Sequence, residues 1–256
     1  MKNDVRNDVR SDMKCRLDVK LLQDGLYTSR EKARKNIQAG NVAVNGELIY
    51  QASYKVDDTD KIEALGNVDK FISRGGLKLE KALDFFQIDL QGKDVLDIGA
   101  STGGFTQCML ERGARNVIAI DVGHGQMAQE IRDDARVTNM EKTNIRYVTS
   151  EMLAYRGDFA AVDVSFISLK MVIPVVKMLL AAHGEMVCLV KPQFEAGKQA
   201  LGKHGVVKDE KVRAAVVEEL TAFVEACEMS VAGVVESPIT GGDGNVEFLM
   251  YVLKRG

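Results

Sequence analysis

Cysteine and histidine are scarce in this sequence, and their spacing excludes a zinc site. Four cysteines and three histidines are spread over 256 residues. None of them stand at the short intervals at which tetrahedral zinc ligands recur. Without a disulfide framework, the cysteines are expected to be reduced thiols, which is typical of a cytoplasmic protein. We therefore expect no metal and a cytoplasmic location.

The sequence also has no long hydrophobic run. It shows no N-terminal apolar region of the signal-peptide type, and no stretch approaches the ~20 apolar residues that a membrane-spanning helix needs. No membrane partner is expected. Hydrophobic residues make up 46% of the chain, which is enough for a sizeable core in one large domain or two unequal ones.

The formal net charge of −3 favours no class of partner, but the charge is unevenly distributed. Residues 1–81 carry 16 Lys/Arg and 13 Asp/Glu, a net charge of +3. Residues 82–256 carry 18 Lys/Arg and 24 Asp/Glu, a net charge of −6. A basic N-terminal part and an acidic C-terminal part predict two modules with different partners.

Residues 1–13 contain the short repeat NDVRNDVRSD, which is dense in opposite charges and poor in apolar residues. Such a segment has too little apolar surface to pack, so we expect a disordered tail, and Met13 is an alternative start of the natural chain. A small module is expected over residues 14–66, and a linker over residues 67–76.

The small module is predicted to be α+β. Leu17, Leu21 and Leu22 are expected on the buried face of one helix, and Ala33 and Ile37 on that of a second helix. The run VAVNGELIY then has the apolar alternation and the central Asn-Gly of a β-hairpin, and DKIEAL predicts one more short strand.

From residue 77 to residue 256, strands alternate with helices, which predicts an α/β fold with a mostly parallel sheet. The last two strands are joined only by SPITGGDGN, which is too short for a crossover helix, so the last strand is expected to be antiparallel. The expected strands are Val95–Ile98, Val117–Ile120, Val137–Met140, Ala160–Val164, Met186–Val190, Val231–Val235 and Val246–Leu253.

The stretch VLDIGASTGGF predicts a strand, a glycine-rich turn and the start of a helix. Gly99, Gly103 and Gly104 would let the backbone approach a ligand closely, and a helix N-terminus favours polar or anionic groups. Asp121 ends the next strand, where an acid would bind a ribose hydroxyl. The spacing is not the G-x-G-x-x-G of dinucleotide-binding folds. The pattern that begins with Asp97 instead resembles the first motif of S-adenosylmethionine-dependent methyltransferases.

Three charged side chains are expected to meet at one edge of the sheet. Asp163 ends one parallel strand and Lys191 ends the next, and ligands bind at the carboxyl ends of such strands. Glu247 stands at the start of the antiparallel last strand, which begins at that same edge. Three charged groups converging beside the glycine-rich turn predict a catalytic site.

The stretch SREKARK, at the start of the second helix of the small module, brings Arg30, Lys32, Arg34 and Lys35 together. A run of charge is usually a solvated helix face. With the VNG hairpin that follows, however, the chain from Arg16 onward resembles the small RNA-binding domain named after ribosomal small-subunit protein S-four. That resemblance implies that these four cations, together with Arg16, bind folded RNA through its phosphates.

Five motifs, SRGGLKLEKAL, DIGASTGGF, VDVSFISL, KPQFE and GNVEFL, together resemble the haemolysin A/TlyA family of ribosomal RNA 2′-O-methyltransferases, which are related to FtsJ-type enzymes. The resemblance covers nearly the whole chain after the tail. It implies a Rossmann-like methyltransferase domain over residues 77–256. The Lys-Asp-Lys-Glu tetrad of the family falls on Lys78, Asp163, Lys191 and Glu247.

The resemblance also implies S-adenosylmethionine as the cofactor and a ribose 2′-OH of ribosomal RNA as the methyl acceptor. The methionine end of the cofactor is expected over Gly99–Gly104, Ser101 included, with Asp121 on the cofactor ribose. Asn144, after the third strand, is a candidate contact for the adenine.

Two roles for Lys191 stay open: a general base for the hydroxyl proton, or a cation that stabilises the developing alkoxide. Two other classes of function also stay open. A catalytically silent RNA-binding or ribosome-assembly factor is disfavoured by the intact tetrad. A membrane-active haemolysin is disfavoured by the lack of an amphipathic or apolar membrane segment. The expected partner is ribosomal RNA or a ribosomal subunit.

Overall fold

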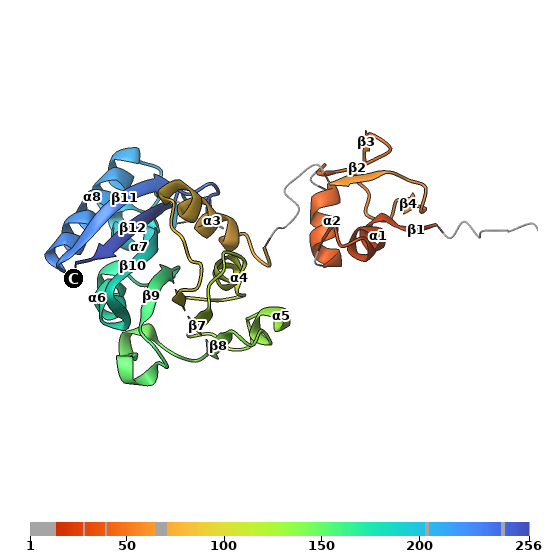
Figure 1. The fold of residues 1–256 in the computed structure, drawn as a ribbon. Helices are drawn as coiled ribbons and strands as arrows, with labels where there is room; N and C mark the ends of the chain where they lie inside the picture. Colours follow the sequence, from red (N-terminus) through yellow and green to blue (C-terminus); the bar gives the residue numbers. More distant parts are fainter. Residues whose placement is uncertain are drawn as a thin grey trace, which may run out of the picture. The chain divides into compact units, whose positions relative to one another are not determined.

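The structure, a computed structural model, divides the chain into two compact units, Met1–Lys70 and Phe71–Gly256 (Figure 1). Residues 1–13, for which a disordered tail is expected, lie outside the described residues. Those that the structure describes are 14–27, 29–38, 40–64, 71–202, 205–241 and 244–255.

The first unit combines a pair of packed helices with two small antiparallel sheets. One sheet has the strand order β3-β2-β5, and the other pairs β1 with β4. The elements are β1 (Cys15–Arg16), α1 (Leu17–Gln23), α2 (Arg30–Gln38), β2 (Val42–Val44), β3 (Glu47–Leu48), β4 (Lys55–Val56) and β5 (Ile62–Ala64).

The core of this unit lies between the helix pair and the strands. Leu17 and Leu21 of α1 and Ala33 and Ile37 of α2 are fully buried, as predicted. The expectation that Leu22 shares this core is wrong, since its side chain is 38% exposed. Successive residues of an α-helix differ in direction by about 100°, so Leu22 turns away when Leu21 faces inward.

The predicted hairpin forms between β2 and β3. Asn45 and Gly46 connect the two strands with positive φ angles of 54° and 85°. A two-residue turn needs such angles to match the twist of the strands that it joins, and Asn-Gly adopts them readily.

A seven-stranded sheet forms the second unit, in the order β11-β12-β10-β9-β6-β7-β8. β12 runs antiparallel to both of its neighbours, β10 and β11, and all other neighbouring pairs are parallel, as predicted. The strands are β6 (Asp94–Ile98), β7 (Asn116–Ile120), β8 (Val137–Met140), β9 (Gly157–Val162), β10 (Leu180–Val190), β11 (Met229–Glu236) and β12 (Phe248–Lys254).

Six of the seven strands differ from the prediction in at least one boundary, most by one to three residues. β9, for example, spans Gly157–Val162 instead of Ala160–Val164. β10 begins at Leu180 instead of Met186, with a shift in its register against β9 between Leu180 and Glu185. The polar and glycine residues of this first part hide the strand from a search for apolar runs. β12 begins at Phe248 instead of Val246, so Glu247 lies immediately before the strand.

Helices cover both faces of the sheet and create two cores. Val95 of β6 packs in the core under α3 and α4, whereas its neighbour Leu96 packs in the core under α6 and α8. Among the described residues, no helix has the length and hydropathy to cross a membrane. The helices are α3 (Gly75–Phe86), α4 (Gly104–Glu111), α5 (Gln129–Arg132), α6 (Leu169–Leu179), α7 (Pro192–Glu195), α8 (Glu210–Ala226) and the 3-10 turns η1 (Ile145–Tyr147), η2 (Ser150–Met152) and η3 (Lys198–Ala200).

The segment expected as a linker belongs in part to the second unit. Phe71 is only 2% exposed and packs in the core under α3 and α4. α3 begins at Gly75, and a Cβ atom on Gly76 would lie 2.2 Å from the Phe71 ring. Gly76 therefore allows the aromatic ring to pack directly against the helix, which places residues 71–76 in the folded unit.

We predict that Phe71→Ala destabilises the second unit by about 3–5 kcal/mol, because it leaves a cavity in a packed core. Phe85→Ala is the matched control. Phe85 belongs to α3, the helix against which Phe71 packs, but its side chain is 54% exposed, so its loss should cost less than about 1 kcal/mol. Urea unfolding followed by circular dichroism measures both, and equal costs would contradict the assignment of Phe71 to the core.

Candidate active site

Strand directions bring charged residues from distant parts of the chain to one edge of the sheet. β9 and β10 are parallel neighbours, so the residues after their carboxyl ends, Asp163 and Lys191, lie side by side. β12 runs the other way, and its Phe248 pairs with Val190, the last residue of β10. Glu247 therefore lies beside Lys191, as the sequence predicts.

Two lysine–carboxylate pairs form at this edge. Lys191 Nζ lies 2.6 Å from Asp163 Oδ1, and Lys78 Nζ, from α3, lies 2.5 Å from Glu247 Oε2. Lys78 and Glu247 are 8% and 3% exposed, so the second pair is almost dry. The structure thus brings together the four residues that the family resemblance selected, while their roles in catalysis stay predictions.

The Lys191 ammonium is held by two groups of one loop. Besides its ion pair with Asp163, it donates a hydrogen bond to Ser165 Oγ at 2.9 Å. The contact with Asp163 is an ion pair without hydrogen-bond alignment, since among the described residues Asp163 Oδ1 has no aligned donor. Only 11% of the Lys191 side chain is exposed.

A pocket of about 250 Å³ opens beside these pairs. Lys78 and Asp163 share its wall with the glycine-rich turn after β6 and the start of α3. The lining residues are Ser73, Arg74, Gly75, Lys78, Gly99, Ala100, Ser101, Thr102, Gly104, Phe105, Asp163 and Ile239.

The glycines of the turn bring segments of the protein itself together. Gly99 has a φ angle of 88°, and a Cβ atom there would lie 2.1 Å from the backbone oxygen of Asp163. A Cβ atom on Gly104 would lie 2.1 Å from Ser73 Oγ. Gly103, with a φ angle of 96°, is the N-cap of α4 and does not line the pocket. The glycine spacing therefore shapes the wall of the pocket through close backbone packing.

Besides Gly103, two more of the predicted cofactor residues, Asp121 and Asn144, lie outside the pocket lining. The Asp121 carboxylate accepts hydrogen bonds from Ser101 N at 2.8 Å and Gly123 N at 2.6 Å, which ties the turn after β6 to the end of β7. Asn144 accepts a hydrogen bond from Arg146 N at 3.1 Å and caps η1. The structure brings Asp121 to the turn that forms the pocket but assigns the Asn144 side chain a local capping role.

Asp97 is a buried carboxyl group directly under the turn. Its Oδ2 accepts a hydrogen bond from Thr106 Oγ1 at 2.5 Å, and Oδ1 has no hydrogen-bond partner among the described residues. Burial raises the pKa of Asp97 to about 7. A buried carboxylate oxygen without a donor suits a cationic group of a bound ligand. The sequence marked Asp97 as part of the motif but not as a site residue.

Phe166 is a candidate that the sequence analysis missed. Its ring is 92% exposed, lies 5.1 Å from the ring of Phe194 and follows the residues that hold Lys191. Its φ angle is 62°, a region that bulky residues rarely adopt. An aromatic side chain three positions after Asp163 was the available signal, but only the structure shows that it is exposed.

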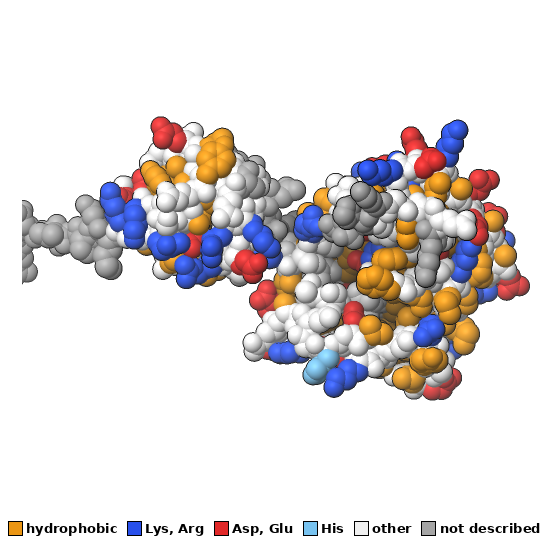
Figure 2. Space-filling view, turned by 180° about the vertical axis from the view of Figure 1, so that it is seen from behind, with side chains coloured by type: hydrophobic (Ala, Val, Ile, Leu, Met, Phe, Trp, Pro, Cys, Tyr) orange, Lys and Arg blue, Asp and Glu red, His pale blue; other side chains and the backbone are white. Residues whose placement is uncertain are grey.

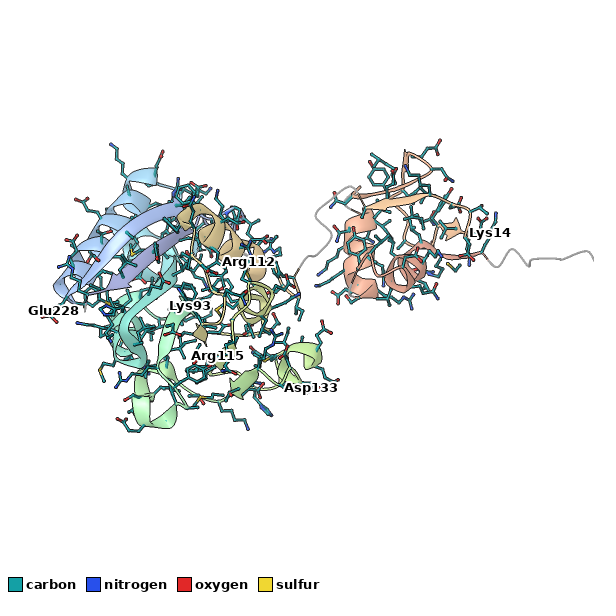
Figure 3. The ribbon with its side chains drawn as sticks, viewed as in Figure 1. Lys14, Lys93, Arg112, Arg115, Asp133 and Glu228 are labelled. Atoms are coloured by element: carbon teal, nitrogen blue, oxygen red, sulfur yellow. The ribbon has the colours of Figure 1, made fainter. Side chains whose placement is uncertain are left out.

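The opposite edge of the sheet carries ion pairs of a structural kind. Arg115 donates to Asp94 Oδ1 at 2.9 Å, and Lys93 pairs with Glu185, which also accepts from Tyr251 (Figure 3 labels Lys93 and Arg115). Arg115 and Asp94 join the neighbouring strands β6 and β7 at their amino ends, whereas Lys93 and Glu185 link β6 to β10 across β9. None of these residues lines the pocket beside the glycine-rich turn.

Four of the predicted RNA-binding cations lie on α2 and the fifth, Arg16, in β1. Figure 2 shows Lys and Arg side chains gathered on the visible face of this unit. Arg34 and Lys35 line a shallow depression on α2 with Arg30. Arg16 and Arg30 also bind the fully buried Asp18, at 2.9 and 3.1 Å. These two arginines therefore have a structural role of their own.

Lys32 lies in the first turns of the same helix. Its backbone N–H donates to Ser29 Oγ at 3.3 Å, so the residue helps to start α2. The structure thus brings four of the five predicted cations onto or beside α2, and Arg16 joins them through Asp18.

The sheet order, the glycine-rich turn after its central strand and the charged edge beside that turn define a Rossmann-like methyltransferase. The model of the FtsJ-like methyltransferase family matches residues 71–254, and that of the S4 domain matches residues 15–62. The chain belongs to the FtsJ-like methyltransferase family, with an S4 domain before the methyltransferase domain.

Named relatives and solved structures agree with this assignment. The 16S/23S rRNA (cytidine-2′-O)-methyltransferase TlyA of Mycobacterium tuberculosis is 40% identical, over 93% of this chain and 90% of that protein. Hemolysin A of Brachyspira hyodysenteriae is 39% identical, over 93% and 99%. A solved hemolysin-like protein from Streptococcus thermophilus is 42% identical, with a TM-score of 0.75 and coverage of 96% and 90%.

A more distant solved structure shows the fold alone. The S-adenosylmethionine-dependent methyltransferase of Mesorhizobium loti is 15% identical, with a TM-score of 0.52, over 68% of this chain and 96% of that one. The match confirms the Rossmann-like sheet that the alternation of strands and helices predicts.

The raised pKa of Asp97 predicts a pH-dependent stability. In the unfolded chain Asp97 has an ordinary pKa near 3.8, so the unfolded state loses this proton first as the pH rises. The free energy of unfolding should therefore fall from about pH 4 to about pH 7 and lose nothing further above that. Asp97→Asn, which keeps an acceptor for Thr106, should remove this decline in urea unfolding.

Asp133→Asn is the control for this measurement, because the Asp133 side chain is 60% exposed (Figure 3). An Asp97→Asn variant with the pH dependence of the wild type would show that the carboxyl group ionises normally in the folded chain.

Proposed function

We propose that this protein transfers a methyl group from S-adenosylmethionine to a ribose 2′-OH of ribosomal RNA. The observation that carries the proposal is the pair of lysine–carboxylate contacts, Lys191–Asp163 and Lys78–Glu247, beside the pocket of the glycine-rich turn. The relative in Mycobacterium tuberculosis is named for this reaction on cytidines of 16S and 23S rRNA. Such a reaction belongs in the cytoplasm, where ribosomal RNA is.

The pocket residues fit S-adenosylmethionine. The turn from Gly99 to Thr102 offers backbone groups along the pocket wall. Asp97, two residues before this turn, does not line the pocket, but its Oδ1 atom has no hydrogen-bond partner among the described residues, and its negative charge favours a cationic group of the cofactor nearby. Asp121 retains acceptor capacity for a ribose hydroxyl next to Ser101. The bound cofactor supplies an electrophilic methyl group, and the protein must align the hydroxyl with it.

Lys191 is the residue best placed to act on the attacking hydroxyl. Its Nζ atom already holds one hydroxyl group, that of Ser165, at 2.9 Å, which is within the range for proton transfer. Ser165 is exposed, so a ribose hydroxyl can take up the same position. Asp163 orients the ammonium, and Lys78 with Glu247 adds a second fixed pair of charges close to the reacting atoms.

The target nucleotide needs a surface that holds its base away from the RNA stack. Phe166 offers an exposed aromatic face next to Lys191, and base–aromatic stacking tolerates any base. The S4 domain would supply affinity through RNA phosphates, with Arg34 and Lys35 as cations on the open face of α2.

Replacement of Lys191 separates the enzyme from a catalytically silent RNA-binding factor. Lys191→Met should slow methyl transfer by ~100- to 10,000-fold in single-turnover assays, while cofactor and ribosomal subunits still bind. Lys170→Met, which removes a partly exposed lysine of α6, should leave the rate unchanged. Equal rates for the two variants would exclude a catalytic role of Lys191.

Lys191→Arg tests which of the two roles Lys191 has. Arginine retains the positive charge but does not release its proton near neutral pH. An inactive arginine variant that binds both substrates supports the base. A near-normal rate leaves only electrostatic stabilisation of the alkoxide.

The S4 domain is tested by reversing charge on α2. A chain with Arg34→Glu and Lys35→Glu should bind ribosomal RNA more weakly, and its affinity should fall less steeply with salt, because fewer counterions are released. Arg30 is left intact because it binds the buried Asp18. Lys211→Glu, on the exposed side of α8, is the control. An unchanged affinity and salt slope would show that α2 does not dock RNA.

A further inference from the structure

Three contacts connect the segment after β9 with the segment after β10. The first is the contact of Lys191 with Asp163 and Ser165. The second is aromatic. The Phe194 ring lies 5.1 Å from the Phe166 ring at an angle of 47°, and the Lys191 ammonium lies 5.9 Å from the centre of the Phe194 ring. Both aromatic residues therefore belong to the surroundings of the proposed catalytic lysine.

Glu195 makes the third contact and uses both of its oxygens. Oε2 accepts a hydrogen bond from Ser168 Oγ at 2.6 Å, and Oε1 accepts one from Leu169 N at 2.8 Å. Ser168 is the N-cap of α6, and its Oγ accepts from Lys170 N at 3.2 Å. A carboxylate from another loop thus completes the first turn of α6.

A carboxylate suits this position for two reasons. The first N–H groups of a helix have no partner within the helix, and the helix dipole favours a negative charge beside them. Hydrogen bonds to an ionised carboxylate are also stronger than those between neutral groups. Glu195 therefore determines where α6 begins and, with it, where the loop before α6 ends.

That loop holds a strained residue in place. Phe166, with its φ angle of 62°, lies between the end of β9 and the clamped start of α6. Such a backbone conformation persists only where the surrounding contacts enforce it. The β9 strand fixes one end of the loop, and Glu195 fixes the other at Ser168 and Leu169.

We propose that Glu195 is a positioning residue for methyl transfer. By closing the first turn of α6 it holds residues 163–168 in the arrangement in which Asp163 meets Lys191 and Phe166 stays exposed. Glu195 does not touch the reacting atoms and acts through this loop. The inference rests on the proposed methyl transfer, but the contact itself can be tested without activity.

The activity test compares two substitutions of Glu195. Glu195→Ala removes both contacts and should lower kcat by ~100-fold, because misplacement by about 1 Å has that effect in preorganised sites. Glu195→Gln keeps an acceptor for Leu169 N and can donate to Ser168 Oγ, so it should restore most of the rate. Cofactor affinity should change much less than the rate in either variant, because the glycine-rich turn follows β6 and Asp163 is the one residue of the loop 163–168 that lines the pocket.

Glu219→Ala is the matched control. Glu219 binds Lys170 Nζ at 2.5 Å, on the same turn of α6, but makes no contact with the loop among the described residues. The substrates are S-adenosylmethionine with a labelled methyl group and ribosomal subunits from cells that lack this gene. Equal rate losses for Glu195→Ala and Glu195→Gln, or for Glu195→Ala and Glu219→Ala, would overturn the proposal.

Hydrogen exchange of the full chain gives a measure that does not depend on activity. Glu195→Ala should speed exchange at Leu169 and over residues 163–170, and leave residues 97–104 unchanged. Glu195→Gln should resemble the wild type. Unaltered exchange over residues 163–170 in Glu195→Ala would overturn the proposal even if the rate falls. A wild-type chain that transfers no methyl group would instead overturn the proposed function, and the exchange result would still decide whether Glu195 holds the loop.

Discussion

Antiparallel pairing of β12 with β10 is the constraint on which the candidate site depends. Parallel strands alone would present only residues that follow their carboxyl ends, which here are Asp163 and Lys191. Because β12 enters the sheet from that edge, the residue before it, Glu247, joins them. Glu247 in turn binds Lys78 and thereby anchors α3 to the same edge. One reversed strand thus unites residues separated by up to 169 positions in the chain.

Burial gives the two ion pairs different characters. Lys78 and Glu247 are almost completely removed from water, which costs desolvation energy that only a close and well-oriented contact offsets. A pair of this kind contributes little net stability but tolerates few other arrangements. The Lys191–Asp163 pair is more open at its carboxylate, since the Asp163 side chain is 22% exposed, and Lys191 also reaches an exposed hydroxyl group. The dry pair therefore suits a fixed framework, and the open pair suits contact with a substrate.

Much of the architecture was predictable because it depends on local patterns. Apolar runs marked the seven strands, and the short loop before the last strand implied its reversal. The errors concern residues whose burial is decided by tertiary packing and not by the composition of the segment around them. Phe71 reads as part of a polar, glycine-containing linker but fills the core under α3. Leu22 fits an apolar helix face by its type, yet the direction of its neighbour Leu21 turns it outward.

The sequence by itself determined the class of fold, the glycine-rich turn and the edge at which Asp163, Lys191 and Glu247 meet, since strand directions follow from the lengths of the segments that connect the strands. Lys78 was found by resemblance alone. Tertiary structure decided that Asn144 caps a turn and does not line the pocket, that a buried oxygen of Asp97 has no partner among the described residues, that Phe166 is exposed and that Glu195 joins two loops. These features depend on side-chain directions and on contacts between segments distant in the chain, which no local pattern encodes.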